Sequence, residues 1–287
     1  KREIQQPFTT QTREKYELKG ITILDYFAIF KKFAFTYGPQ ESYKLDHIAN
    51  IVLGEKKLDF GEASNLNELY TNDYQKFIDY NIKDVELIDR MEDKLGLITL
   101  CLTMAYKGGV NYDSVLGTVA IWDSLIYRHL YEYKITIPQN EESFKSAYPG
   151  GYVKEPQVGM HDWVCSFDLN SLYPSIIMQY NMSPETILLD DEPGTNVESV
   201  LNNKIKNTHY YTGLAVNGTR FDCKKRGVFP QVIQKIYDER VKFKQKQIKA
   251  EQELELSGSK SEQYDIEKRI ALAKNQQMAL KILLNSL

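Results

Sequence analysis

The spacing of apolar residues predicts several long helices. Between residues 73 and 95 apolar side chains recur at about helical spacing, which predicts one long packed helix. LDHIANIVLG (45–54) is typical of a helix that ends at Gly54. A further helical stretch runs from Tyr112 to Tyr133.

Near the C-terminus the pattern predicts an antiparallel helical hairpin. Its two helices, roughly 230–256 and 262–287, flank the breaker Ser-Gly-Ser at 257–259. Four leucines fall at positions i, i+3, i+4 and i+7 of the second helix, which predicts packing between the two helices: Leu280, Leu283, Leu284 and Leu287.

Strand signals are fewer. YELKGITILD (16–25) and WVCSFDLN (163–170) have strand character, and the second is followed by a transition into a helix. GLAVNGTRFD (213–222) places Asn-Gly between two β-like runs, which predicts a hairpin and a small sheet. YPGGYV (148–153) predicts a turn.

Composition allows about two domains and excludes several classes of protein. The chain has 287 residues, of which 42% are hydrophobic, so it is neither disordered nor collagen-like. No apolar run approaches the roughly 18 residues of a membrane span. The three cysteines are far apart, which excludes a disulfide framework and a CxxC zinc site. We therefore expect a cytoplasmic protein without a membrane partner.

Charge is distributed unevenly. The net charge of −3 argues against a protein that coats nucleic acid by bulk charge. Residues 155–203 hold eight Asp or Glu and no Lys or Arg, whereas residues 220–249 hold ten Lys or Arg and three Asp or Glu. An acidic stretch followed by a basic one suits a site that holds metal ions beside a polyphosphate, because divalent cations need carboxylates and phosphates need cationic side chains. Two ordinary solvated surfaces are the alternative.

Asp168 lies at the end of a predicted strand and just before a predicted helix. By itself, an aspartate there is best explained as a helix N-cap. The surrounding DLNSLYPSII (168–177), however, resembles the A motif of family B DNA polymerases, Asp-x-x-Ser-Leu-Tyr-Pro-Ser-Ile. A pattern of nine positions is highly specific.

Other segments resemble the same family in the order that it requires. KILLNSL (281–287) is similar to its B motif, cut before Tyr-Gly, and GVFPQVIQKIYDERVKFK (227–244) to its first fingers helix. YPGG (148–151) resembles the turn that joins the exonuclease and polymerase halves. YNIKD (80–84) matches the third exonuclease motif, and SYKLDHIANIVLGEKKLDF (42–60) also resembles the exonuclease domain of this family. YPGGYVKEP and YNMSPET are most similar to replicative polymerases of T-even-type phages.

The resemblance implies a polymerase site around Asp168. This carboxylate would bridge two Mg²⁺ ions, for which Mn²⁺ is an alternative, with the Leu169 carbonyl as a further ligand. The backbone N–H groups of Ser171 and Leu172 would face the triphosphate, and Tyr173 would stack under the sugar and exclude a ribose hydroxyl.

Two polar pairs on the hairpin would hold the incoming nucleotide. Arg240 and Lys244 are four residues apart and share a helix face, as do Lys281 and Asn285. Arg240 can grip phosphate bidentately, while lysines supply point charges. Other lysines of this stretch are expected to be solvated: Lys242, Lys246 and Lys249.

The resemblance implies two further sites. Asp84 would bind an exonuclease metal, and Tyr80, one helical turn away, would orient the attacking water or the scissile phosphate. The turn that contains Tyr148, Gly150 and Gly151 would contact DNA.

Several family motifs are absent from the sequence. The Asp-x-Glu pair of the exonuclease and the Tyr-x-Asp-Thr-Asp-Ser motif of the palm do not occur, so Asp84 and Asp168 lack their carboxylate partners. Together with the missing initiator Met, this predicts an internal fragment that is itself inactive.

We therefore expect an α/β plus α fold in four parts. They are the end of an RNase H-like 3′-5′ exonuclease domain (1–96), a helical connecting region (97–139), the first part of an α+β palm (140–225), and helical-hairpin fingers (226–287).

The intact parent would extend a primer on a DNA template and proofread. Its partners would be primer-template DNA, deoxynucleoside triphosphates, the remainder of the polymerase chain and, as a further candidate, a sliding clamp. Two alternatives stay open. One is a catalytically dead DNA-binding or scaffold subunit of a split polymerase. The other is an unrelated helical interaction protein, for which sustained heptads would be needed, and the sequence does not contain them.

Overall fold

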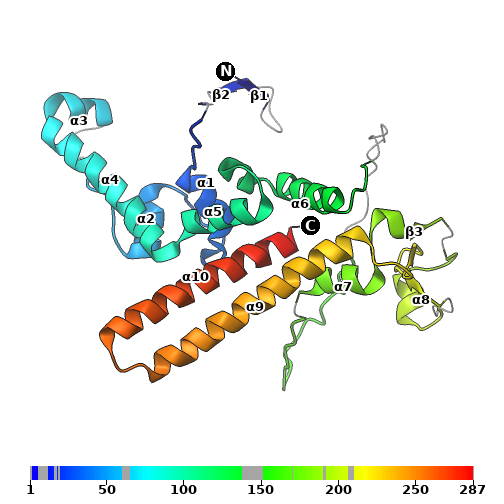
Figure 1. Ribbon diagram of the computed structural model, residues 1–287. Coiled ribbons are helices and arrows are strands. Elements are labelled where there is room, and N and C mark those ends of the chain that lie inside the picture. Colours follow the sequence, from blue (N-terminus) through cyan, green and yellow to red (C-terminus); the bar gives the residue numbers. More distant parts are fainter. Residues whose placement is uncertain are drawn as a thin grey trace. The chain divides into compact units, whose positions relative to one another are not determined.

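The computed structural model describes residues 2–5, 12–15, 18, 20–59, 65–137, 151–169, 171–189, 192–205 and 210–286. The chain divides into two compact units, Lys1–Ile121 and Trp122–Leu287, and each has its own core (Figure 1).

The first unit is mainly helical. Its strands form one antiparallel pair in which Arg2 lies opposite Lys15. Its elements are β1 (Arg2–Gln5), β2 (Thr12–Lys15), α1 (Tyr26–Phe33), the 3-10 helix η1 (Phe35–Tyr37), α2 (Leu45–Leu53), α3 (Leu66–Asn72), α4 (Tyr74–Leu95), α5 (Leu97–Gly108) and the 3-10 helix η2 (Tyr112–Leu116). After Gly117, α6 (Thr118–Glu132) runs across the boundary into the second unit. The helical stretch predicted at 112–133 is thus confirmed, but it consists of a 3-10 helix, η2, and an α-helix, α6.

The ends of these helices follow from their capping residues. Asp73 starts α4, because its side chain accepts a hydrogen bond from the Lys76 N–H at 3.0 Å. Gly96 ends α4 in the left-handed region, with φ of 63°. The Glu92 carboxylate then accepts the Ile98 N–H at 2.9 Å and so caps α5. The helices predicted at 73–95 and 45–54 are confirmed.

The strand predicted at 16–25 is wrong for the residues that are described there. Residues 20–25 form no strand, and no described strand pairs with them. Gly20 has φ of 81°, which breaks extended structure, and Asp25 already caps α1 by accepting the Phe27 N–H at 3.0 Å. A short apolar run forms a strand only where a neighbouring strand provides partners for its backbone N–H and C=O groups. No described strand does so here, and Asp25 starts helix α1 instead.

The core of the first unit lies between its helices. Helix α1 packs against α5 and η2, while α2 and α3 pack against α4. The side chains that they bury most completely include Ile29, Leu87, Met91, Met104 and Val115. Helix α4, which carries Tyr80 and Asp84, is thus packed against both α2 and α3.

The second unit combines a small sheet with the helical hairpin. Its elements after α6 are α7 (Leu172–Tyr180), the 3-10 helix η3 (Pro184–Thr186), β3 (Ile187–Leu188), α8 (Val197–Leu201), β4 (Thr212–Leu214), β5 (Arg220–Asp222), α9 (Val228–Leu256) and α10 (Lys260–Asn285). The sheet is antiparallel, in the order β3-β5-β4. The predicted Asn-Gly hairpin is confirmed as β4 and β5, and the Ala215 N–H donates to the Thr219 carbonyl at 2.9 Å across its loop.

The predicted helical hairpin is also confirmed. Helices α9 and α10 lie side by side in opposite directions, and α7 packs against α9 (Figure 1). Ile233, Leu280 and Leu283 are almost fully buried in this interface. The Trp122 indole N–H donates to the Ser286 hydroxyl at 3.1 Å and so ties α6 to the end of α10. Of the described helices, none is long and apolar enough to cross a membrane.

Candidate functional site

The N-terminus of α7 carries the first candidate site. Ser171 is its N-cap residue and adopts left-handed backbone angles, with φ of 52° and ψ of 48°. The first intrahelical bond joins the Ser175 N–H to the Ser171 carbonyl at 3.0 Å, so the N–H groups of Leu172 and Tyr173 have no partner within the helix. The next residue is Pro174, which has no N–H. Two backbone donors therefore open this helix: Leu172, one of the two predicted residues, and Tyr173, whereas Ser171, the other predicted residue, is the N-cap.

Arg240 reaches this helix terminus from α9. Its Nη1 donates a hydrogen bond to the Ser171 Oγ at 2.9 Å. Its Nε is buried and has no acceptor among the described residues. The structure thus brings together a guanidinium group and the start of α7, two features that both favour an anion.

Lys244, Lys281 and Asn285 are exposed to solvent. The helices that carry these residues, α9 and α10, pack against each other, and the ion pair between Arg269 and Glu253, at 2.6 Å, joins them. Lys244 lies one turn further along α9 than Arg240.

Asp168 is not held in this way. The strand predicted at 163–170 is wrong over its described residues: residues 151–169 are irregular, and every one of them is exposed. No described strand pairs with this segment, so its backbone lacks the partner that a strand requires. Leu169 and Tyr173 are exposed as well. No contact joins Asp168 to Arg240 among the described residues.

The metal site predicted at Asp168 is incomplete in this chain. A carboxylate and a backbone carbonyl are the oxygen donors that Mg²⁺ prefers, and Asp168 and Leu169 could supply them. However, the described residues contain no group of three or more His, Cys, Asp or Glu able to hold a metal. The residues present therefore do not by themselves fit an ion that needs near-octahedral coordination.

The second candidate site lies on α4. Tyr80 is buried, and Asp84 lies one turn further along. Lys57, from the segment after α2, places its Nζ 2.7 Å from the Asp84 Oδ2 and 4.7 Å from the centre of the Tyr80 ring. The other Asp84 oxygen, Oδ1, is buried without a hydrogen-bond partner among the described residues. This oxygen keeps its lone pairs unused, although protein atoms cover it.

The pKa of Lys57 reflects this setting. Burial alone would lower the pKa, but the hydrogen bonds with Asp84 and Tyr80 and the attraction of both groups outweigh it. The pKa of Lys57 is therefore raised, and its ammonium group stays charged beside the carboxylate.

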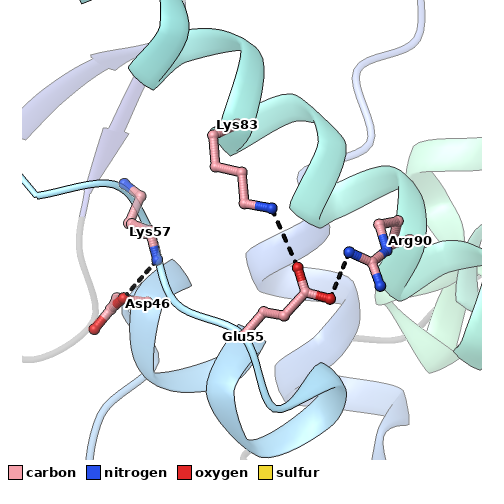
Figure 2. A network of polar contacts seen from close by, with 5 residues as sticks. All are labelled: Asp46, Glu55, Lys57, Lys83 and Arg90. Atoms are coloured by element: carbon pink, nitrogen blue, oxygen red, sulfur yellow. Dashed lines mark hydrogen bonds and ion pairs between the residues drawn. The ribbon is translucent and has the colours of Figure 1, made fainter. Parts of the chain in front are cut away.

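A polar network holds Lys57 in place (Figure 2). Its backbone N–H donates to the Asp46 Oδ1 at 2.8 Å. Glu55, two residues earlier, pairs with Lys83 at 3.1 Å and also with Arg90, both on α4. These contacts lower the pKa of Glu55, the hydrogen bond from Lys83 most of all. Two residues of the segment after α2, Glu55 and Lys57, are thus paired with residues of α4.

Sequence reasoning missed Lys57. It lies within residues 42–60, which resemble the exonuclease domain, but a single lysine in an irregular segment has no periodic pattern that would mark it. Only the folded structure brings it next to Asp84. Of the predicted DNA-contacting residues, Tyr148 and Gly150 lie outside the described residues, and Gly151 begins the exposed segment described above.

Comparison with known proteins agrees with the predicted resemblance. The model of the family described as DNA polymerase family B matches residues 119–287. The DNA-directed DNA polymerase of Enterobacteria phage T4 is 34% identical over 244 residues, which is 85% of this chain and 27% of that protein. The DNA-directed DNA polymerase of Escherichia phage RB69 is 37% identical over 239 residues, 81% of this chain and 25% of that protein.

A more distant relative is DNA polymerase II of Escherichia coli K12, 29% identical over 171 residues, which is 58% of this chain and 22% of that protein. The chain thus spans about a quarter of the length of these relatives. The family match covers more than half of the chain, and it includes α7, α9 and α10. The chain belongs to DNA polymerase family B.

Proposed function

We propose that this chain is part of a DNA-directed DNA polymerase of family B and carries the surface that grips the incoming nucleotide. The observation that carries this proposal is the contact of Arg240 with Ser171 at the start of α7. There, the backbone N–H groups that open α7 and the Arg240 guanidinium group lie at the same helix terminus. A triphosphate could replace the Ser171 hydroxyl as acceptor for Arg240, with Lys244 and Lys281 as further charges.

The remaining site residues have roles in the same proposal. Asp168 and Leu169 would supply oxygen ligands for a metal ion only together with ligands from other parts of a polymerase, and Tyr173 would lie under the sugar. Bound divalent ions would neutralise charge on the transferring phosphoryl group. Primer-template DNA, deoxynucleoside triphosphates and the rest of a polymerase chain are the proposed partners.

Proofreading is assigned to the other unit. Asp84 offers one unpartnered oxygen, and Tyr80 and Lys57 lie beside it. In this proposal Tyr80 and the charged Lys57 hold water or the scissile phosphate against Asp84, and the missing carboxylates come from elsewhere. Such an arrangement would suit a 3′-5′ exonuclease, in which Asp84 would help to hold a metal ion and that ion would supply activation of the water.

The test replaces Arg240 by glutamine in a polymerase that carries this chain. We expect the KM for deoxynucleotide to rise by about tenfold or more, because a charge-assisted hydrogen bond to phosphate is lost. The measurement is primer extension at varied deoxynucleotide concentration.

The matched control is Lys242→Gln. It removes the same charge from an exposed position two residues further along α9, on another face of that helix. Equal effects of the two variants would contradict the proposal. A wild-type protein that binds DNA but never extends a primer would favour a catalytically dead scaffold instead.

A further inference from the structure

The segment between α7 and β3 contains an unusual concentration of buried polar side chains. Asn181, Ser183 and Thr186 are only 3%, 3% and 6% exposed. Burying such groups is costly unless each is hydrogen bonded. Several of their hydrogen-bond partners belong to the connection between β5 and α9.

Asn181 holds the connection from β5 into α9. Its side-chain amide donates to the carbonyl oxygens of Asp222 at 2.6 Å and Lys225 at 2.8 Å. Its Oδ1 accepts the Gly227 N–H at 2.8 Å. One side chain therefore satisfies three backbone groups within six residues, and both of its amide hydrogens are used.

Ser183 and Glu185 continue this cap. The Glu185 Oε1 accepts the Val228 N–H at 2.6 Å, and the Ser183 Oγ accepts the Phe229 N–H at 3.3 Å. The Ser183 hydroxyl in turn donates to the Glu185 Oε2 at 2.7 Å. The N–H groups of residues 227–229 are thus all bonded to the segment that follows α7.

The remaining features of the helix terminus fit this arrangement. Pro230 has no N–H to satisfy, and the N-cap residue, Gly227, has no side chain that could cap its own helix. A Cβ at Gly227 would lie only 2.6 Å from the Ser183 Cβ. The base of α9 is therefore capped from outside, at close contact.

Helix α7 links this cap to the candidate nucleotide site. Its last residue precedes Asn181, and its N-cap residue is Ser171, which contacts Arg240. Helices α7 and α9 pack against each other. Consequently α9 is tied to α7 at two points thirteen residues apart along α9: at Gly227 through Asn181, and at Arg240 through Ser171.

The geometry points to Asn181 as a positioning residue for nucleotide binding: by fixing the base of α9 against the end of α7, it sets where the Arg240 guanidinium lies. This inference rests on the proposed function of Arg240. A purely structural role for Asn181 would affect stability without acting through Arg240.

The test uses Asn181→Asp and Asn181→Gly in the same polymerase. Aspartate keeps the acceptor for Gly227 but turns its second carboxylate oxygen toward two carbonyl groups, whereas glycine keeps the left-handed backbone, φ of 56°, and removes all three bonds. We expect both to raise the KM for deoxynucleotide by about tenfold, with kcat at saturation changed much less. Hydrogen exchange at Val228 and Phe229 should also become faster.

Asn203 supplies matched controls. It is also an asparagine with left-handed backbone angles, φ of 54°, but it is exposed. Asn203→Asp and Asn203→Gly should leave KM and the exchange at Val228 unchanged. An equal rise in KM in these controls would overturn the inference.

A double-mutant cycle decides whether Asn181 acts through Arg240. If it does, the variant with both Asn181→Gly and Arg240→Gln should have the KM of Arg240→Gln alone. Multiplying effects would overturn the inference, as would loss of folding in both Asn181 variants. If Arg240→Gln itself has no effect, the proposed function fails, whereas a normal KM in the Asn181 variants removes only this inference.

Discussion

Lys57 and Arg240 are cations whose side chains reach across to another element of their own unit. Lys57 comes from an irregular segment and pairs with Asp84 on α4. Arg240 comes from α9 and donates to Ser171 at the start of α7. In both cases the partner decides whether a common residue type is a solvated charge or part of a site. Exposed lysines such as Lys242 have the same chemistry without that setting.

His129 gives a prediction at the residue scale. It is buried, and its pKa is lowered, first by burial and then by the positive charge of Lys235, although Glu132 and a hydrogen bond with Gln231 act in the opposite direction. The folded state resists the proton that the unfolded chain takes up near its usual pKa of about 6.5. The free energy of unfolding should therefore fall as the pH is lowered through that value.

Urea unfolding of the chain at several pH values, followed by tryptophan fluorescence, measures this effect. His129→Gln should flatten the pH dependence, whereas His161→Gln, at an exposed histidine, should not. A pH dependence that survives His129→Gln would contradict the prediction.

At the scale of elements, the hairpin of α9 and α10 is stabilised by apolar packing. Leu280 is 1% exposed, while Leu272, on the same helix, is 61% exposed. Replacing each leucine by alanine changes the helix propensity of α10 in the same way, but only the replacement of Leu280 removes a buried side chain.

Leu280→Ala should reduce the free energy of unfolding by about 2–5 kcal/mol, because it leaves a cavity. Leu272→Ala should change it by less than about 0.5 kcal/mol. Both are measured by urea unfolding followed by tryptophan fluorescence. Similar losses in the two variants would show that the helices do not pack as described.

Elements whose signals are local could be predicted from the sequence. The ends of α4 follow from Asp73 and Gly96, and the β4–β5 hairpin follows from Asn-Gly. The strand at 163–170 could not be judged in this way, because a strand depends on a partner that its own residues do not specify. The same holds for sites: a spacing of four residues predicted that Arg240 and Lys244 share one face of a helix, but no spacing rule predicts that Lys57 meets Asp84.

At the scale of the whole molecule, the two candidate sites belong to different units. Asp84 lies in the first unit and Asp168 in the second. We therefore expect the two proposed activities of a polymerase that carries this chain to be separable by single substitutions.

Asp168→Ala should abolish primer extension and leave 3′-5′ excision, and Asp84→Ala should do the reverse. Labelled primer-template, with and without deoxynucleotides, measures both activities. Asp162→Ala, in the same exposed segment as Asp168, and Asp93→Ala, on the same helix as Asp84, are the controls. Normal extension by Asp168→Ala would refute its assignment as a metal ligand.

Helix α9 acts mechanically as a lever. Its 29 residues span about 43 Å, and Arg240 lies about 18 Å from its base. A tilt of about 10° at the base would carry Arg240 through about 3 Å, more than a hydrogen bond to Ser171 can tolerate. A small change in angle at Gly227 thus becomes a larger displacement of the guanidinium group, and so we expect substitutions near Gly227 to weaken the proposed nucleotide binding even though they lie far from that site.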